Sequence, residues 1–285
     1  MEPQIYLISL YLSVEEKFKE AVAGRRLRSR GFEPALSDVE LITIELFGEY
    51  QGHGNDKSIW RYIQTHWLDW FPKLGSYKNF TKHCANLCWV KELILKDLTK
   101  SKRGETYIID GLPMPICKFA RAKRCKLFQT VASFGHCASQ RQTYYGFEGH
   151  LIVTTTGEIR EFSLSPAKDG EREAALDMVE DLWGDMLADK GYVGEDFTQQ
   201  MAIRGIKMHT PLRDNMKDER SREFVKFIMN KRRYIETIIG KLVEQFTLVQ
   251  NKARDIWRLS NKIYRKLLSY TFALQFHGST RFLES

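Results

Sequence analysis

Residues 107–110 read Tyr-Ile-Ile-Asp, and at this stretch the pattern of the chain changes from helices to short strands. Three apolar residues that end in a carboxylate are typical of a buried strand that runs into a polar site. A charge without a partner is unfavourable near a core, so Asp110 needs a reason to be there. We therefore interpret this stretch as the first strand of a sheet and Asp110 as a candidate site residue.

The sequence that follows alternates between strand-like and helical patterns. We predict further strands over residues 129–134, 145–154 and 161–165, a helix over 170–183, a strand over 185–189, a helix over 196–204 and a strand over 206–211. This order indicates a mixed α/β fold, in which helices pack on a mixed sheet. A polar connection over 212–222 is predicted to lead into a long helix that ends near residue 250. We expect a last amphipathic helix, over 256–276, to pack on the sheet domain.

The sequence that precedes residue 105 has the pattern of helices. Ser37 and Glu40 have the spacing of a capping box before an apolar run, and further helices are predicted over 56–67 and 77–98. The polar, glycine-containing segment that begins at residue 100 indicates a domain boundary. We therefore predict an all-helical N-terminal domain over 1–104, with room for a helix-turn-helix, and a second domain over 105–285.

Two further acidic residues occur in settings like that of Asp110. Asp189 opens the sequence Asp-Lys-Gly-Tyr after a predicted strand, and Glu236 lies on the margin of the apolar stripe of the long predicted helix. Mg²⁺ prefers oxygen ligands, is held by a few carboxylates and leaves its other positions to water and phosphate. Three acids in a basic setting therefore indicate a metal site for a phosphodiester. Taken singly, each aspartate could equally cap a turn, and Glu236 could form a helix salt bridge with Arg232.

These segments, in this order, resemble the DDE transposases of bacterial insertion sequences. The resemblance runs through residues 107–111, 144–154, 187–192, 210–213 and 232–237 to the apolar C-terminal stretch. It implies an RNase H-like mixed sheet flanked by helices, preceded by an all-helical domain that binds transposon ends. It also implies metal-dependent DNA cleavage at those ends and strand transfer into target DNA. Enzymes of this kind act on paired DNA ends, so a homodimer or higher oligomer is expected on DNA.

The resemblance also assigns roles to individual residues. Asp110, Asp189 and Glu236 would be the catalytic metal ligands for two Mg²⁺ or Mn²⁺ ions per active site, with Asp110 bridging both ions. DNA contacts would come from neighbouring residues, namely Lys190, Tyr192, Arg213, Arg232, Arg233 and Lys241. The family's basic signature is kept only in part, because its tyrosine falls on Met229 and its lysine on Val243, which leaves Lys241 as the nearest lysine.

The distribution of charge favours a nucleic-acid partner. The formal net charge of the chain is +8, and it divides into +1 over residues 1–110, +5 over 111–150, −8 over 151–196 and +10 over 197–285. Both basic blocks flank candidate carboxylates, where a DNA backbone must lie if a phosphate is to reach the metals. Basic surfaces also occur simply for solubility, so the inference depends on their coincidence with the acids.

Several other features restrict the class of protein. Five cysteines and no secretory leader favour free thiols in a reducing compartment, and the apolar run over 5–12 predicts a buried helix rather than a membrane span. Cys84 and Cys88 are predicted to pack between helices rather than bind zinc. His150 is predicted to be a hydrogen-bonded structural residue of an apolar strand. We expect a cytoplasmic, nucleoid-associated bacterial protein.

Two alternatives to a transposase stay open at this point. One is a nuclease of the same fold that cuts DNA without joining it. The other is a DNA-binding protein descended from a transposase, whose expected mark is the loss of an acidic residue. None of Asp110, Asp189 and Glu236 is lost here.

Overall fold

The computed structural model describes residues 1–25, 27–28, 34–100, 105–137, 141–211, 220–250 and 252–284. The chain forms two compact units, the first of residues Met1–Leu98 with Leu242–Phe276 and the second of Thr99–Lys241 with His277–Ser285. This grouping differs from the expectation that the last long helix packs on the sheet domain. That helix belongs to the first unit, in which it forms buried ion pairs.

The first unit is helical. It contains α1 (Pro3–Val22), α2 (Asp38–Tyr50), α3 (Asp56–His66), α4 (Tyr77–Asn86), α5 (Cys88–Leu98) and nearly all of α9 (Ile256–His277). The predicted capping box is confirmed, because Ser37 accepts a hydrogen bond from the amide of Glu40, and the Glu40 side chain accepts one from the amide of Ser37. The single helix predicted over 77–98 is wrong in one respect, since the chain breaks at Leu87 into α4 and α5. Cys84 and Cys88 are buried on either side of this break, as predicted for packing residues.

Buried ion pairs explain why α9 belongs to the first unit. Glu49 of α2 accepts a hydrogen bond of 2.7 Å from Arg265 Nε and one of 2.9 Å from Lys266 Nζ, both on α9. Glu45, one turn before Glu49, is paired with Lys91 of α5. All five side chains are almost fully buried. Because removing one partner would leave an uncompensated charge in the core, these pairs tie α2, α5 and α9 to one another.

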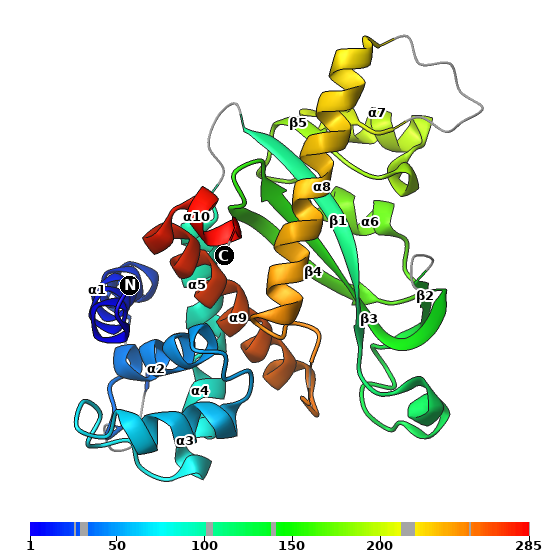
Figure 1. The fold of residues 1–285 in the computed structure, drawn as a ribbon. Helices are drawn as coiled ribbons and strands as arrows, with labels where there is room; N and C mark the ends of the chain where they lie inside the picture. The colour runs from blue at the N-terminus through cyan, green and yellow to red at the C-terminus, as the bar shows by residue number, and fades with distance from the viewer. Residues whose placement is uncertain are drawn as a thin grey trace. The chain divides into compact units, whose positions relative to one another are not determined.

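The second unit is built on a six-stranded mixed sheet (Figure 1). Its strands are β1 (Thr106–Pro115), β2 (Ser133–Cys137), β3 (Gln142–Thr154), β4 (Ile159–Pro166), β5 (Gly184–Leu187) and β6 (Ile206–His209). They lie in the order β2-β3-β1-β5-β6, and β4 pairs with β3. β1 is antiparallel to β3 and parallel to β5, and β5 is parallel to β6. The predicted mixed α/β fold with flanking helices and an N-terminal helical region is confirmed, whereas the strand predicted over 129–134 is displaced to Ser133–Cys137.

The remaining elements of the second unit are mainly helical. They are the 3-10 helices η1 (Phe119–Arg124) and η2 (Lys190–Tyr192), the helices α6 (Glu171–Met178), α7 (Glu195–Ile203) and α10 (Ser279–Glu284), and nearly all of α8 (Arg222–Glu244). Among the helices that the structure describes, none is long and apolar enough to cross a bilayer.

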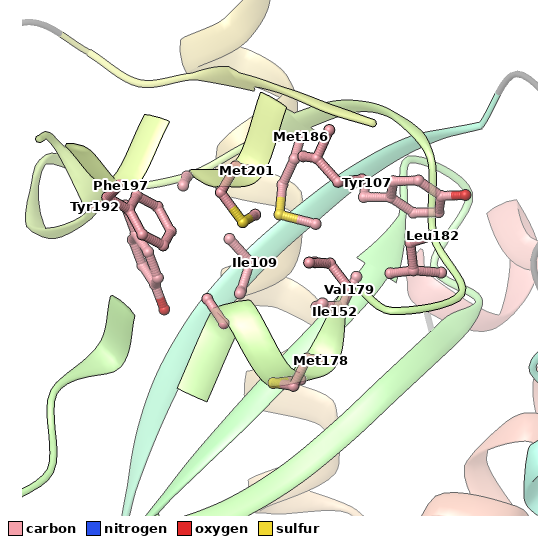
Figure 2. Packing of buried hydrophobic residues seen from close by; sticks show 13 residues of the cluster. Tyr107, Ile109, Ile152, Met178, Val179, Leu182, Met186, Tyr192, Phe197 and Met201 are labelled. Carbon is pink, nitrogen blue, oxygen red and sulfur yellow. The ribbon is translucent and has the colours of Figure 1, made fainter. Parts of the chain in front are cut away.

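One face of the sheet packs against α6 and α7 (Figure 2). Tyr107 and Ile109 of β1 lie in this apolar cluster with Met186 of β5 and with side chains of both helices. Successive side chains of a strand point to opposite faces. Asp110 therefore points to the other face of the sheet, away from this core.

Candidate active site

Asp110 and Asp189 lie at matching positions, each shortly after one of two paired residues on neighbouring strands. Ile108 of β1 is paired with Leu187 of β5 in a parallel register, and each aspartate lies two residues after its member of this pair. β5 pairs only with residues 106–108 of β1, so the two strands part where the acids begin. Because paired residues of parallel strands lie side by side, the fold brings these two aspartates near each other although they are far apart in sequence.

Backbone amides fix the orientation of both aspartates. Asp110 Oδ1 accepts a hydrogen bond of 2.9 Å from the amide of Gly111. Asp189 Oδ1 accepts one of 2.6 Å from the amide of Lys190, at the start of η2. Asp110 is half-buried, whereas 46% of the Asp189 side chain is exposed. In each carboxylate this hydrogen bond uses Oδ1, and the other oxygen, Oδ2, takes no part in it.

Glu236 reaches this site through Arg232, one turn before it on α8. Arg232 Nη2 lies 3.4 Å from Asp189 Oδ2 and 3.7 Å from Glu236 Oε1. Since both distances are measured to one nitrogen, the two oxygens are no further apart than the sum of these distances, about 7 Å. Glu236 is largely exposed, and Arg232 is mostly buried. The helix salt bridge considered as an alternative role for Glu236 is thus present, and it includes Asp189.

Burial and neighbouring charges make Asp110 a weak acid. The pKa of Asp110 is raised to about 6, chiefly by burial and in smaller part by the carboxylates of Asp189 and Glu171. The hydrogen bond from Gly111 and the charge of Arg232 act in the opposite direction. The pKa of a carboxyl rises in this way when its negative charge is insufficiently compensated. A cation at this site would remove that deficit.

Two acids near the site are ones that sequence reasoning missed. Glu148 of β3 accepts a hydrogen bond from the hydroxyl of Tyr144, and its pKa is raised to about 7 by burial first and then by Glu171 and Asp110. Glu171 begins α6, and its pKa is raised by desolvation first and then by the charge of Asp189. The carboxylate of Glu171 lies close to Gly111 and Gly191, and this proximity is produced by the fold.

The candidate ligands at this site are of the chemical type that a hard divalent cation binds. The groups gathered here are carboxylate oxygens, the ligands that Mg²⁺ and Mn²⁺ prefer, and their shared negative charge exceeds that of Arg232. In the part of the chain that the structure describes, however, no three His, Cys, Asp or Glu side chains are close enough to hold an ion. The guanidinium of Arg232 lies between Asp189 and Glu236 instead. The three-acid metal site therefore stays a prediction.

Comparison with protein families identifies the chain. Residues 100–256, more than half of the sequence, match the family described as a transposase DDE domain. The chain belongs to the DDE transposase family. Among solved structures, this transposase chain is similar to one from a cryo-electron microscopy structure of a piggyBac transposase synaptic complex with hairpin DNA, with 9% identity and a TM-score of 0.49. That similarity covers 98% of this chain and 76% of the other. No curated protein matches the sequence.

The basic residues expected to contact DNA are distributed unevenly in this transposase domain. Lys190 and Arg233 are exposed, so both are accessible to a phosphate backbone. Arg232 is occupied by the two carboxylates, and its Nε atom is buried without a hydrogen-bond partner among the described residues. Arg213 lies outside the described residues.

Tyr192 and Lys241 occupy positions that do not fit the expected DNA contact. Tyr192 is only 1% exposed and packs in the apolar cluster, because η2 turns its ring inward beside Phe197. The Lys241 ammonium donates a hydrogen bond to the backbone carbonyl of Phe282. It also lies 4.5 Å from the centre of the Phe282 ring. In this structure both side chains make contacts within the protein. His150 is buried and bonded to Ser165 Oγ at 2.8 Å, which confirms its predicted structural role.

Two cavities of the transposase are lined by cationic side chains. One, of about 530 Å³, lies along the first half of α8 and is lined by Arg220, Arg222, Lys226 and Arg233 with three uncharged residues. The other, of about 520 Å³ in the helical unit, is lined by Asn55, Asp56, Lys57, Tyr77, Thr81, Lys252, Ala253, Arg254, Arg258 and Lys262. The acid in this second cavity, Asp56, already pairs with Arg265. Its excess of positive charge is suited to phosphate groups.

Proposed function

We propose that this protein is the transposase of a bacterial insertion sequence, which cleaves DNA at the ends of its element and joins the released 3′-hydroxyl to target DNA. The observation that supports this most directly is the placement of Asp110 and Asp189 at equal distances after the paired residues Ile108 and Leu187. Membership of the DDE transposase family makes phosphodiester chemistry the natural use of such a pair.

Asp110, Asp189 and Glu236 would hold the divalent ions, Mg²⁺ or Mn²⁺, with two ions per active site. Such ions, when bound, activate water or a 3′-hydroxyl and stabilise the leaving oxygen. The residues of the chain then have separate tasks. Asp110, held by the amide of Gly111, supplies a fixed carboxylate from the sheet. Arg232, released from Asp189 and Glu236, becomes available to a DNA phosphate.

DNA binding in this proposal uses surfaces on both units. Exposed Lys190 and Arg233 contact the backbone near the cleaved bond, and the basic cavity along α8 continues that surface. The helical N-terminal unit binds the transposon end, with its own basic cavity as the candidate contact. Two DNA ends must be handled together, so the active form is a homodimer or higher oligomer on DNA. We place the protein with its substrate, at the bacterial nucleoid.

The decisive experiment measures Mg²⁺-dependent cleavage and strand transfer on labelled ends of the protein's own element. We expect near-complete loss of both for Asp110→Ala, Asp189→Ala and Glu236→Ala, with DNA binding kept. Asp196→Ala is a matched control, because Asp196 is an exposed acid of the same unit in the first turn of α7.

Each alternative predicts a distinct result in this assay. Cleavage without a joined product would favour a nuclease, and DNA binding without cleavage would favour a non-catalytic descendant. A fully active Glu236→Ala protein would contradict the role given to that residue.

A further inference from the structure

The connection between β1 and β2 is strongly basic. Its sequence, residues 116–132, contains lysines and arginines but no aspartate or glutamate. The 3-10 helix η1 holds three of these cations within six residues. All the cations of the connection are exposed, namely Lys118, Arg121, Lys123, Arg124 and Lys126. Because no acid of the connection neutralises them, their charges add up and attract a polyanion.

Two aromatic rings are exposed beside these charges. Phe119 of η1 is 49% exposed and Phe134 of β2 is 47% exposed, and their ring centres are 6.4 Å apart. The ring of Phe134 also lies 5.1 Å from that of Tyr145, on the neighbouring strand β3. Tyr145 is buried and donates a hydrogen bond of 3.3 Å to the carbonyl of Leu127. Phe134 therefore packs on a ring that is held in place while it keeps much of its own surface open to a ligand.

The rings and the cations meet in a third cavity, of about 660 Å³, which we call the aromatic cavity. It is lined by Phe134 and Tyr145, by Lys123 and Lys168, and by Gln129 together with small residues. The amide of Lys168 donates a hydrogen bond of 2.8 Å to Ser133 Oγ, which joins the end of β4 to β2. Ring faces, cations and a side-chain amide are the groups that a nucleotide requires for its base, its phosphate and its base edge.

Phe134 and Tyr145 point to the face of the sheet that carries Asp110. Asp110 is paired with Leu151 of β3, and Phe134 is paired with Tyr145 of the same strand. Paired side chains share a face, and so do residues an even number of positions apart on one strand. Tyr145 and Leu151 are separated by an even number of positions, which at about 3.3 Å per residue corresponds to about 20 Å along β3. A DNA strand that reaches Asp110 can therefore continue to the aromatic cavity along one face of the sheet.

We propose that the aromatic cavity binds an unpaired stretch of a DNA strand, with a base stacked on Phe134 and the adjoining phosphates on Lys123 and Lys168. This inference rests on the proposed function, because the strand belongs to the same DNA substrate. A duplex offers its phosphates to the two lysines but keeps the faces of its bases inside the stack, out of reach of Phe134. An exposed ring beside cations favours a single strand, because every base has a face that can stack.

The test measures binding of a single-stranded oligonucleotide that contains 2-aminopurine, whose fluorescence is quenched when the base stacks, without metal and without turnover. We expect Phe134→Ala to bind about tenfold more weakly than the wild type and to lose quenching at saturation. Phe134→Tyr, which keeps a ring, should retain both. Phe134→Leu keeps an apolar side chain over Tyr145 and should still lose the quenching. Trp183→Ala is the control, since Trp183 is an exposed aromatic residue of the same unit.

The salt dependence of the affinity tests the two lysines. Lys123→Gln and Lys168→Gln should each reduce the slope of log affinity against log salt by about 0.7, as loss of one phosphate contact to a single strand does. Both variants should keep the quenching at saturation, because the ring is intact. Lys207→Gln should change neither quantity, since Lys207 is exposed on β6, at the other edge of the sheet.

Two results would overturn the inference. Quenching that persists in Phe134→Ala and Phe134→Leu would show that no base stacks on this ring. Binding of duplex DNA but not of the single strand by the wild type would make the surface a contact for duplex phosphates only. Neither result touches the proposed function, which fails instead if the wild type does not cleave the ends of its element with Mg²⁺.

Discussion

Arg232 Nη2 lies 3.4 Å from Asp189 Oδ2, which joins α8 to the turn after β5. The same nitrogen is 3.7 Å from Glu236 Oε1. The guanidinium therefore occupies the space between two carboxylates that a divalent cation would bind in the proposed function. A fixed positive charge and a metal ion compete for the same oxygens, because each stabilises their negative charge. In the proposed function, Arg232 accordingly has one role before DNA and metal bind and a second role afterwards.

Replacement of Arg232 by glutamine should separate these two roles. We expect Arg232→Gln to bind Mn²⁺ as tightly as the wild type or more tightly, because the competing charge is gone. Cleavage should fall at least about a hundredfold, since the proposed contact of Arg232 with a DNA phosphate near the reacting bond is lost. Mn²⁺ titration and single-turnover cleavage measure the two effects.

Arg233→Gln provides the comparison for this variant. Arg233 is exposed and faces the basic cavity of α8, so its loss should weaken DNA binding and leave Mn²⁺ affinity unchanged. Weaker Mn²⁺ binding by Arg232→Gln would show that the arginine supports the site rather than competes for it.

The raised pKa of Asp110, about 6, predicts a pH dependence of metal binding. Below this pH the carboxyl keeps its proton, and a metal ion must displace it. We expect Mn²⁺ affinity to fall by up to about tenfold for each pH unit below 6. Titrations between about pH 5 and pH 7.5 measure this slope, and an affinity that is flat across the range would contradict the role of Asp110 as a ligand.

The raised pKa of Asp110 also makes the stability of the metal-free protein depend on pH, in the direction opposite to that of metal affinity. The folded state binds the Asp110 proton more tightly than the unfolded state, whose carboxyl has a pKa near 3.8. Stability should therefore decrease as the pH rises from about 4 to about 6. Urea unfolding of the wild type and Asp110→Asn tests this, because the variant should lose that part of the slope. Glu148, with a pKa of about 7, extends the decrease toward neutral pH in both proteins.

The local patterns of the sequence predicted most of the sheet and its two aspartates. Apolar runs of strand length ended at acids, and that pattern depends only on neighbouring residues. The full extent of β1 was not predicted, because Pro113 and Pro115 normally interrupt a strand. They are accommodated here because β5 pairs only with residues 106–108 and leaves that side of the later residues open.

Features that depend on distant contacts were not predictable from these patterns. Only the fold brings the carboxylate of Glu171 beside Gly111 and Gly191. The place of α9 in the helical unit depends on ion pairs between residues more than 200 positions apart, such as Glu49 and Arg265. Tyr192 follows an acid and a lysine in sequence, but the 3-10 turn directs its ring into the core.

The basic cavity of the helical unit predicts residues that hold DNA without taking part in the chemistry. We expect Lys252→Glu and Lys262→Glu to weaken DNA binding and to lower the salt dependence of the affinity by about one ion per lost phosphate contact. Fluorescence anisotropy with labelled duplexes at several salt concentrations measures both quantities. Mn²⁺ affinity should be unchanged.

Lys73→Glu is the charge-matched control for these two variants. Lys73 is exposed on the same unit and is not among the residues that line the cavity. If Lys73→Glu weakens DNA binding as much as Lys262→Glu, the effect is one of net charge, and the cavity is not the contact.

The buried ion pairs of the helical unit predict that replacement of Glu49 strongly lowers the stability of the protein. Glu49 accepts from both Arg265 and Lys266, and all three side chains are essentially excluded from solvent. Glu49→Gln should lower the free energy of unfolding by about 3–5 kcal/mol, because it leaves buried positive charge without its counterion. Urea denaturation followed by circular dichroism gives this value. Glu20→Gln, which removes an exposed partner of Lys17, should cost less than about 1 kcal/mol.

A double variant distinguishes a lost counterion from a lost packing contact. In Glu49→Leu with Lys266→Met, both members of one buried pair become apolar, and Arg265 keeps Glu45 and Asp56 as partners. The double variant should therefore regain part of the stability that Glu49→Gln loses, because buried ion pairs can be replaced by apolar residues of similar size without loss of stability. A double variant less stable than Glu49→Gln would mean that the bonds from Lys266 to the carbonyls of Gly54 and Phe246 matter more than the charge balance.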